Sequence, residues 1–470
     1  MRKLPLVQIM FFLFVIAGSF MGLSAIINFV YLPLAFILGL YLFRVSSPHY
    51  LGFCMWLWML TPLVRRVVDF NTTYHAESLV MLAPFLGSCI AAMSIPKLLR
   101  KRISAYVLPY LGIIAIVLWG FVIGLFQSGL FAAAYAALTW LGPIFIALHI
   151  LSHPELIEVN TSQIFKAFEW GVLIIGVYGL YQFFFYPAWD DYWVTNSAMG
   201  AIGFAEAGNV RLFSTMNSPG VFALFLTAGL ITILPKQGIF KNIVFSVGLA
   251  ALMLSLVRSA WLCFLMGFVF ILFAISWKRR IRYVFGALVL AVVSLPLLLI
   301  GPIANQIQSR LQTFNNLSQD ASFQSRSNLY DQFSQFASGS LSGNGLGSTG
   351  AASKLSSSDY SSLDSGLLDL IYTFGLSSIA FFLCLLGVAY FCFRKRNNGI
   401  HAQTAIAITF ALIFQLLIAN ILYAPTGVLF FVFSSIAMLH GRQCIESALL
   451  SSDPRYPDFK LFRNIERTRL

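Results

Sequence analysis

Apolar runs long enough to cross a membrane follow one another along almost the whole chain. A helix needs about 20 predominantly apolar residues to span the hydrocarbon core of a bilayer. Fourteen runs approach this length, and the shortest of them leave twelve as the alternative number. They cover residues 6–22, 25–43, 49–64, 78–95, 104–126, 130–151, 164–186, 218–234, 242–257, 259–277, 283–301, 364–393, 401–420 and 425–440. The pattern predicts an all-α, polytopic bundle of about 12–14 membrane-spanning helices.

A single long polar segment, residues 302–363, interrupts these runs and holds 16 serines among its 62 residues. It divides the chain into membrane helices over 1–301 (about eleven spans), a loop over 302–363, membrane helices over 364–440 and a polar tail over 441–470. Two amphipathic helices are expected in the loop. The first repeats apolar residues at Ile303, Ile307, Phe314 and Leu317, and the second covers 322–337 with Phe323, Tyr330, Phe333 and Ala337 on one face. The glycine-rich stretch 339–350 follows no predicted strand, so we expect a mobile turn.

The composition excludes an ordinary soluble protein, because 59% of the residues are hydrophobic and only 10% are charged. The net charge of +13 could suggest a nucleic-acid partner, but the basic residues are segregated. With the N-terminus inside and fourteen spans, 23 of the 30 Lys and Arg face the cytoplasm and seven face outward. This positive-inside bias predicts cytoplasmic termini, an external loop 302–363 and no binding of nucleic acid. The first 22 residues lack a signal-peptide cleavage site, and the six cysteines lack metal or redox spacing, so we expect neither a metal nor a disulfide.

Arg258 stands in the middle of a 36-residue apolar run, 242–277, which must fold as two spans that meet at the sequence SLVRSAW. An ionisable side chain within a membrane run costs about 2.5–3.5 kcal/mol on insertion scales and usually has a function. The alternative is an arginine that extends to the lipid headgroups. Arg326 poses a similar choice, because it lies on the apolar face of the second loop helix. It either extends to water or pairs with a carboxylate, or its planar guanidinium binds an anion such as phosphate.

Further candidates lie in the other external segments. Arg211 stands a few residues before a helix start at Asn217, Ser218 and Pro219. Arg65 is four residues before Asp69, which favours a local ion pair, although Arg65 or Arg66 could instead contribute to an external anionic site. Trp189 and Asp190 belong to an aromatic stretch, 178–194, that suits the membrane interface. The alternative there is a platform for sugar rings, with Asp190 accepting hydrogen bonds from hydroxyl groups.

Asp364 ends the polar loop where the chain re-enters the membrane. An Asp in this position either caps a helix or, as the best-placed external carboxylate, acts as a general base. Asp359, His75 and Asp190 are the next candidates for a base.

Four stretches together resemble the O-antigen ligase and polymerase family of bacterial envelope glycan enzymes. They are RLFSTMNSPGVFALFL, SLVRSAWLCFLMG, SRSNLYDQF with GNGLGS, and LDSGLLDLIYTFGL, arranged around one large external loop. PLVRRVVDF, YGLYQF, WDDYW and TFGLSS extend the resemblance over most of the chain.

The resemblance implies a GT-C-like membrane glycosyltransferase of the bacterial inner membrane that needs neither a cofactor nor a metal. Its donor would be a glycan on polyprenyl diphosphate, and its product an exopolysaccharide, capsule or O-antigen chain. Arg258, Arg326 and Arg211 match the family arginines that bind the diphosphate, and Asp364 stands where the family keeps a His. That substitution favours a polymerase over a ligase that attaches glycan to lipid A core in lipopolysaccharide. Membrane lipid, a chain-length regulator and a flippase are further expected partners.

The chemistry agrees with this reading. Guanidinium groups in a site of low dielectric stabilise the charge on a departing diphosphate, and a carboxylate can accept the proton of an attacking sugar hydroxyl. The rival function is a polysaccharide transporter or flippase, which would place polar residues at the midplane of the membrane. The apolar runs show no such pattern and no internal repeat.

Overall fold

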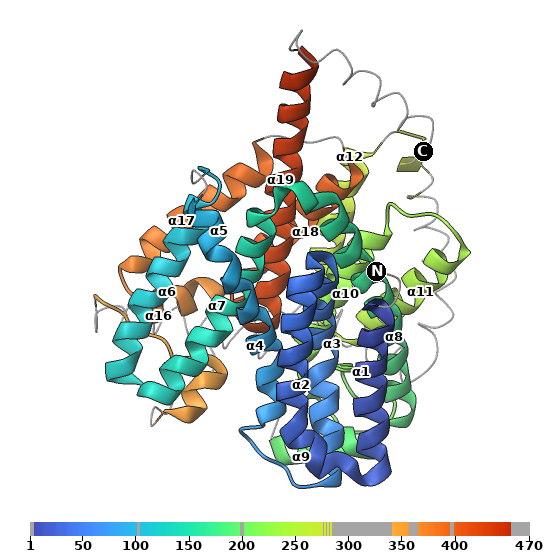
Figure 1. The fold of residues 1–470 in the computed structure, drawn as a ribbon. Helices are drawn as coiled ribbons and strands as arrows, with labels where there is room; N and C mark the ends of the chain where they lie inside the picture. Colours follow the sequence, from blue (N-terminus) through green and yellow to red (C-terminus); the bar gives the residue numbers. More distant parts are fainter. Residues whose placement is uncertain are drawn as a thin grey trace, which may run out of the picture.

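The computed structural model describes residues 4–100, 104–197, 202–275, 277–278, 280–281, 283, 341–356, 365–394 and 399–452. Within these residues the chain is helical and forms no strand, apart from one isolated bridge between Gly203 and Val210. The predicted all-α class is therefore confirmed for the described chain. The helices pack into a single bundle (Figure 1). They are α1 (Leu4–Gly18), α2 (Ser24–Val45), α3 (Ser47–Asn71), α4 (Ala83–Cys89), α5 (Ile95–Arg100), α6 (Leu108–Gln127), α7 (Leu130–Ser152), α8 (Ile157–Phe185), α9 (Ala188–Ser197), α10 (Pro219–Ile233), α11 (Ile239–Leu254), α12 (Arg258–Ala274), α16 (Gly366–Phe374), α17 (Ser377–Phe393), α18 (Ile400–Gln415) and α19 (Ala424–Ser452).

Six helical stretches are long and apolar enough to cross a membrane, and six shorter apolar helices accompany them in the described chain. The first stretch, Leu4–Val45, is two helices, because Gly22 at φ 86° turns the chain back between α1 and α2. Phe11 of α1 stacks on Tyr31 of α2 at 5.6 Å between ring centroids, as expected for an antiparallel hairpin. These helices support the prediction of a membrane protein.

Where the structure describes them, the helices lie on the predicted runs, and some differ from them in extent. The run 283–301 lies almost wholly outside the described residues, and so do the amphipathic helices of the polar loop. The run 364–393 is broken into α16 and α17 at Gly375, whose φ of 55° few other residues adopt. Helix α19 continues to Ser452 through the predicted boundary at residues 440–441, so the tail begins as a helix.

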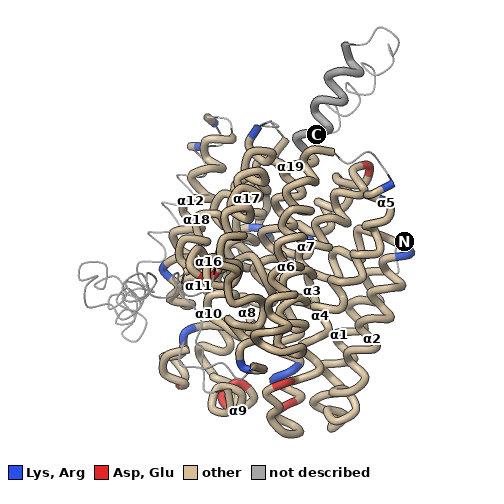
Figure 2. Tube along the Cα trace, turned by 90° about the vertical axis from the view of Figure 1, so that its left-hand side faces the viewer, with Lys and Arg blue, Asp and Glu red and all other residues tan. Residues whose placement is uncertain are grey.

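The bundle has two distinct ends. One end, here called the loop end, holds the connections 19–23, 72–78, 128–129, 186–218, 255–257, 341–356 and 416–423. The other, the basic end, holds most of the described Lys and Arg, namely Arg44, Lys97, Arg100, Lys166, Lys236, Lys241, Lys278, Arg280 and Arg394. At the loop end lie Arg65, Arg66, Arg211, Arg258 and Lys354. Figure 2 shows most charged residues toward these two ends.

Candidate functional site

The segment between α9 and α10 enters the bundle at the loop end instead of covering its surface. Val210, Leu212 and Phe213 are fully buried, and so are Ser214 and Thr215. The hydroxyl of Thr215 donates a hydrogen bond to the carbonyl of Met59 in α3 at 2.6 Å. Loops usually run over the surface because buried backbone needs hydrogen-bond partners. This segment is therefore an ordered part of the protein interior, and it fixes the position of Arg211.

Arg211 meets the turn between α11 and α12, which the sequence predicts as the apex of an apolar run. Its Nη2 donates to the carbonyl of Leu256 at 3.4 Å, and its backbone N–H donates to the carbonyl of Ile202 at 3.0 Å. The neighbouring backbone N–H of Leu212 donates to the carbonyl of Leu254 at 3.3 Å. Two segments that are 45 residues apart in sequence are thus tied together, and Arg211 contacts a residue only two positions before Arg258.

Arg258 is the first residue of α12 and is half-buried. Thr227 of α10 donates to the carbonyl of Ala260 at 3.3 Å. Since Thr227 lies well inside α10 whereas Ala260 lies in the first turn of α12, α12 begins about 9 Å deeper in the bundle, at about 1.5 Å per residue. Arg258 is therefore recessed below the start of α10, and as the first residue of α12 it lies at the positive end of that helix dipole.

A short chain of contacts leads from Arg258 to the start of α16. The next residue, Ser259, accepts a hydrogen bond from Gln415 Nε2 at 3.1 Å. The residues after Gln415 pack closely against α16. A Cβ added at Gly366 would lie only 2.5 Å from the carbonyl oxygen of Leu416. Asp364 and Arg326 lie outside the described residues. The structure thus brings together Arg211, Arg258 and the helix that follows Asp364.

Backbone strain is concentrated at the same end. In the described chain, four residues other than glycine have a positive φ, namely Tyr186, Ser214, Leu256 and Ala424, with φ values of 40°, 51°, 54° and 52°. Each such residue costs of order 1–3 kcal/mol and persists only where its surroundings hold it, often at functional sites. The Leu256 carbonyl is held by Arg211, and the Ser214 carbonyl accepts a hydrogen bond from Arg66.

The glycine-rich stretch differs from the expected mobile turn over residues 341–350. The backbone N–H groups of Asn344, Gly345 and Leu346 donate to the carbonyls of Tyr372, Thr373 and Gly120 at 2.8–3.0 Å. Leu346 is buried, and its carbonyl oxygen would clash with a Cβ added at Gly124 of α6. The loop thus passes so close to α6 that a side chain at that position has no room. The three N–H groups thus hold this stretch in a fixed position against α6 and α16.

Arg66 and Asp190 form an ion pair that is fully buried, with 2.6 Å between Nη1 and Oδ1. The other carboxylate oxygen of Asp190 accepts from Gln182 at 2.5 Å and from the hydroxyl of Tyr178 at 3.0 Å. The guanidinium also lies 4.9 Å from the centre of the Phe213 ring. Burial raises the pKa of the Asp190 carboxyl above its usual range, whereas the Arg66 guanidinium opposes that rise. This network joins α3, α8, α9 and the buried segment.

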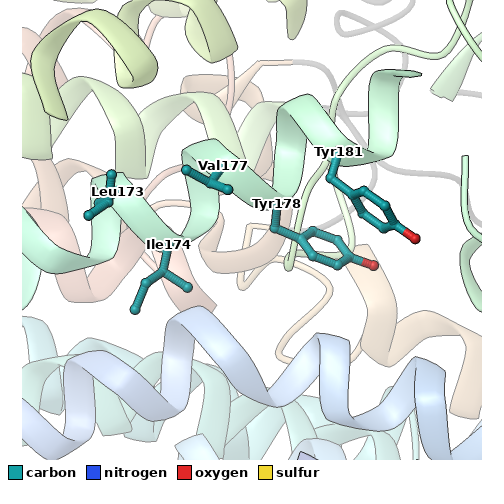
Figure 3. A pocket seen from close by; sticks show the side chains of 5 residues that line it. All are labelled: Leu173, Ile174, Val177, Tyr178 and Tyr181. Atoms are coloured by element: carbon teal, nitrogen blue, oxygen red, sulfur yellow. The ribbon is translucent and has the colours of Figure 1, made fainter. Parts of the chain in front are cut away.

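The surroundings of Trp189 and Asp190 differ from those expected of residues that bind a sugar ring. Asp190 has no exposed surface, and Trp189 donates its indole N–H to Tyr178 at 2.7 Å. With Tyr178, Trp189 lines an apolar hollow of about 180 Å³ bounded by Ile16, Ser19, Phe20, Leu63, Val64 and Val67. A shallow apolar groove continues past Tyr178 along α8, where the Tyr178 and Tyr181 hydroxyls point the same way (Figure 3). We therefore interpret Asp190 as a structural residue.

Arg65 forms the predicted ion pair with Asp69, at 3.2 Å between Nε and Oδ2. Its Nη2 donates to the carbonyl of His75 at 2.7 Å. These contacts hold the connection after α3 against the helix. The structure thus places Arg65 and Arg66 in two separate networks of the fold.

Asp369 is a loop-end residue that the sequence pattern alone did not single out. It lies in α16 and is only 3% exposed. Its carboxylate accepts from Asn420 Nδ2 at 2.6 Å and from the Thr373 hydroxyl at 3.4 Å, and Thr349 is a third hydrogen-bond donor. The signal was present in the sequence, because Asp369 interrupts the apolar stretch LLDLIY as Arg258 interrupts its own.

Among the described residues, no group of three or more His, Cys, Asp or Glu side chains could hold a metal ion. No model of a known protein family matches the chain, and no curated protein matches it either.

Proposed function

We propose that the protein is a membrane glycosyltransferase that transfers or polymerises glycan repeat units from a polyprenyl-diphosphate donor at the outer face of the bacterial inner membrane. The observation that carries this proposal is the contact of Arg211 with the turn that leads into Arg258 at the recessed start of α12. Arg211 reaches the Leu256 carbonyl at 3.4 Å, on the strained turn that immediately precedes Arg258. Two guanidinium groups near the N-terminus of α12 suit a diphosphate whose prenyl tail remains in lipid.

In this mechanism, a hydroxyl oxygen of the acceptor sugar attacks the anomeric carbon of the donor glycan. The bond from that carbon to the diphosphate oxygen breaks, and its electron pair leaves with the polyprenyl diphosphate. Arg211 and Arg258, with Arg326 from the loop, stabilise the charge that develops on the leaving oxygens. Asp364 takes the proton of the acceptor hydroxyl. Gln415, which holds Ser259 at 3.1 Å, joins the start of α12 to the region that supports α16.

The distribution of charge supports the orientation. Nine of the Lys and Arg named above lie at the basic end and five at the loop end. By the positive-inside rule the basic end faces the cytoplasm, together with both termini. The loop end and the segment 302–363 then face the periplasm, where lipid-linked glycans are presented.

A deletion strain tests the proposal through its surface polysaccharide, resolved by length on a gel. Single repeats on lipid would identify a polymerase, and bare lipid A core would identify a ligase. Complementation with Arg258→Lys should fail to restore the wild-type pattern, because lysine keeps the charge but lacks the planar fork of donors. Unchanged surface polysaccharide in the deletion strain would contradict both activities.

A further inference from the structure

We propose that Asp369 is a positioning residue that sets the start of α16 against the start of α12. This inference rests on the proposed function. Asp369 is buried at 3% exposure, and the described residues place no Lys, Arg or His in an ion pair with it. A carboxylate buried without a cation costs several kcal/mol unless hydrogen bonds compensate it. The burial of a carboxylate at this position therefore needs a reason other than apolar packing.

The three donors to Asp369 come from three separate parts of the loop end. Thr349 belongs to the glycine-rich stretch, Thr373 to α16 itself, and Asn420 to the connection between α18 and α19. An ionised carboxylate only accepts hydrogen bonds and can receive all three at once. An amide in its place would keep one acceptor oxygen, and its NH2 group could pair with a threonine hydroxyl oxygen but not with the Asn420 NH2 group. The carboxylate at position 369 thus joins these three parts of the loop end.

These same parts enclose the start of α16. Asn420 is itself fixed, because its Oδ1 accepts from the N–H of Leu422 at 3.0 Å. Gly366 is packed so closely that an added Cβ would lie 2.7 Å from the carbonyl oxygen of Ala419. Asp369 lies one helical turn beyond Ser365, and its N–H donates to the Ser365 carbonyl at 3.0 Å. A shift at Asp369 therefore moves Ser365 and the first turn of α16.

The test compares purified wild-type protein with Asp369→Asn and Asp369→Ala, using lipid-linked glycan from the producing bacterium. Turnover is expressed per folded molecule, taken from the monodisperse size-exclusion peak. We expect Asp369→Ala to lower kcat by about tenfold or more, since hydrogen bonds to a charged group make a large contribution. Asp369→Asn should lose less, because one acceptor remains. KM for the donor should stay unchanged, and Asp191→Asn, at an exposed carboxylate of the same end, should match wild type.

A second readout does not depend on activity. Ser365 is 1% exposed, so a thiol introduced by Ser365→Cys should react slowly with a maleimide, as measured by mass spectrometry of its peptide. Combining it with Asp369→Ala should speed the labelling, because α16 loses its anchor. Unchanged labelling, or full turnover in both Asp369 variants, would overturn the positioning role alone. A wild-type protein that transfers no glycan would overturn the proposed function, and the inference with it.

Discussion

Asp190 and Asp369 are both buried carboxylates at the loop end, and their partners differ in charge. Asp190 faces the Arg66 guanidinium at 2.6 Å, so the charges of this pair cancel inside the protein. Asp369 faces the amide of Asn420 at 2.6 Å and two hydroxyl groups, all of which are uncharged. The first network holds four segments together. The second joins α16 to the glycine-rich stretch and to the connection between α18 and α19.

Burial alone therefore does not identify a functional residue. Breaking a buried ion pair leaves an unpaired charge, so its partners are needed for folding. Arg211 contacts the strained turn that precedes Arg258, and strained backbone is often found at functional sites. We therefore expect the variants below to separate folding from catalysis.

The largest expected effect is an all-or-none difference in labelling that tests the orientation of the protein in the membrane. Both networks must lie at the outer face of the membrane. Lys354 is exposed at the loop end, and Lys97 is 42% exposed at the basic end. In intact spheroplasts, a membrane-impermeant maleimide should label Lys354→Cys but label Lys97→Cys only after lysis. The reverse pattern would contradict the orientation on which the site depends.

Removing the charge of Asp190 should cost the most stability. Asp190→Ala strands the buried Arg66 guanidinium, and breaking such a pair costs about 3–5 kcal/mol. We expect loss of the monodisperse peak in detergent or a large fall in Tm. The double variant Arg66→Met with Asp190→Leu should recover part of the loss, because no buried charge remains. A double variant no better than Asp190→Ala would argue against the ion pair as the cause.

Arg258→Lys should show the opposite pattern, with normal folding and weak activity. Its Tm should stay near that of wild type, whereas kcat/KM should fall at least about tenfold, equivalent to about 1.4 kcal/mol of transition-state stabilisation. Arg211→Lys is expected to act in the same direction. Activity assays and thermal unfolding of the same preparations check both values. A lysine variant with full activity would remove that arginine from the proposed site.

Arg65→Ala should have the smallest effect, although Arg65 is next to Arg66 in sequence. It pairs with Asp69 within one helix and donates to the carbonyls of His75 and Ala76. Losing these contacts should cost about 1 kcal/mol in stability and leave turnover per folded molecule unchanged. A change in turnover without a change in Tm would place Arg65 in the site instead of the fold.

Much of the fold could be predicted from the sequence, because hydropathy over about 20 residues decides which segments can enter a membrane. Local geometry was harder to predict. The break at Gly375 and the packed glycine-rich stretch depend on close contacts with other helices, such as that between Leu346 and Gly124. The pairing of Arg66 with Asp190 joins residues 124 apart in sequence, which no local pattern shows. Arg258 was recognisable because it interrupts an apolar run, and the same criterion would have identified Asp369.

The most direct test of the account is glycan transfer by the detergent-purified protein. Wild-type protein, Arg258→Lys and Arg65→Ala are incubated with fluorescent lipid-linked repeat units, with and without a chelator, and chain length and released polyprenyl diphosphate are measured together. We expect wild type and Arg65→Ala to make longer glycans and to release one polyprenyl diphosphate for each unit added, with or without the chelator. Arg258→Lys should make few longer glycans and release little polyprenyl diphosphate. No elongation and no transfer to lipid A core by wild type, or equal turnover by Arg258→Lys, would contradict the account.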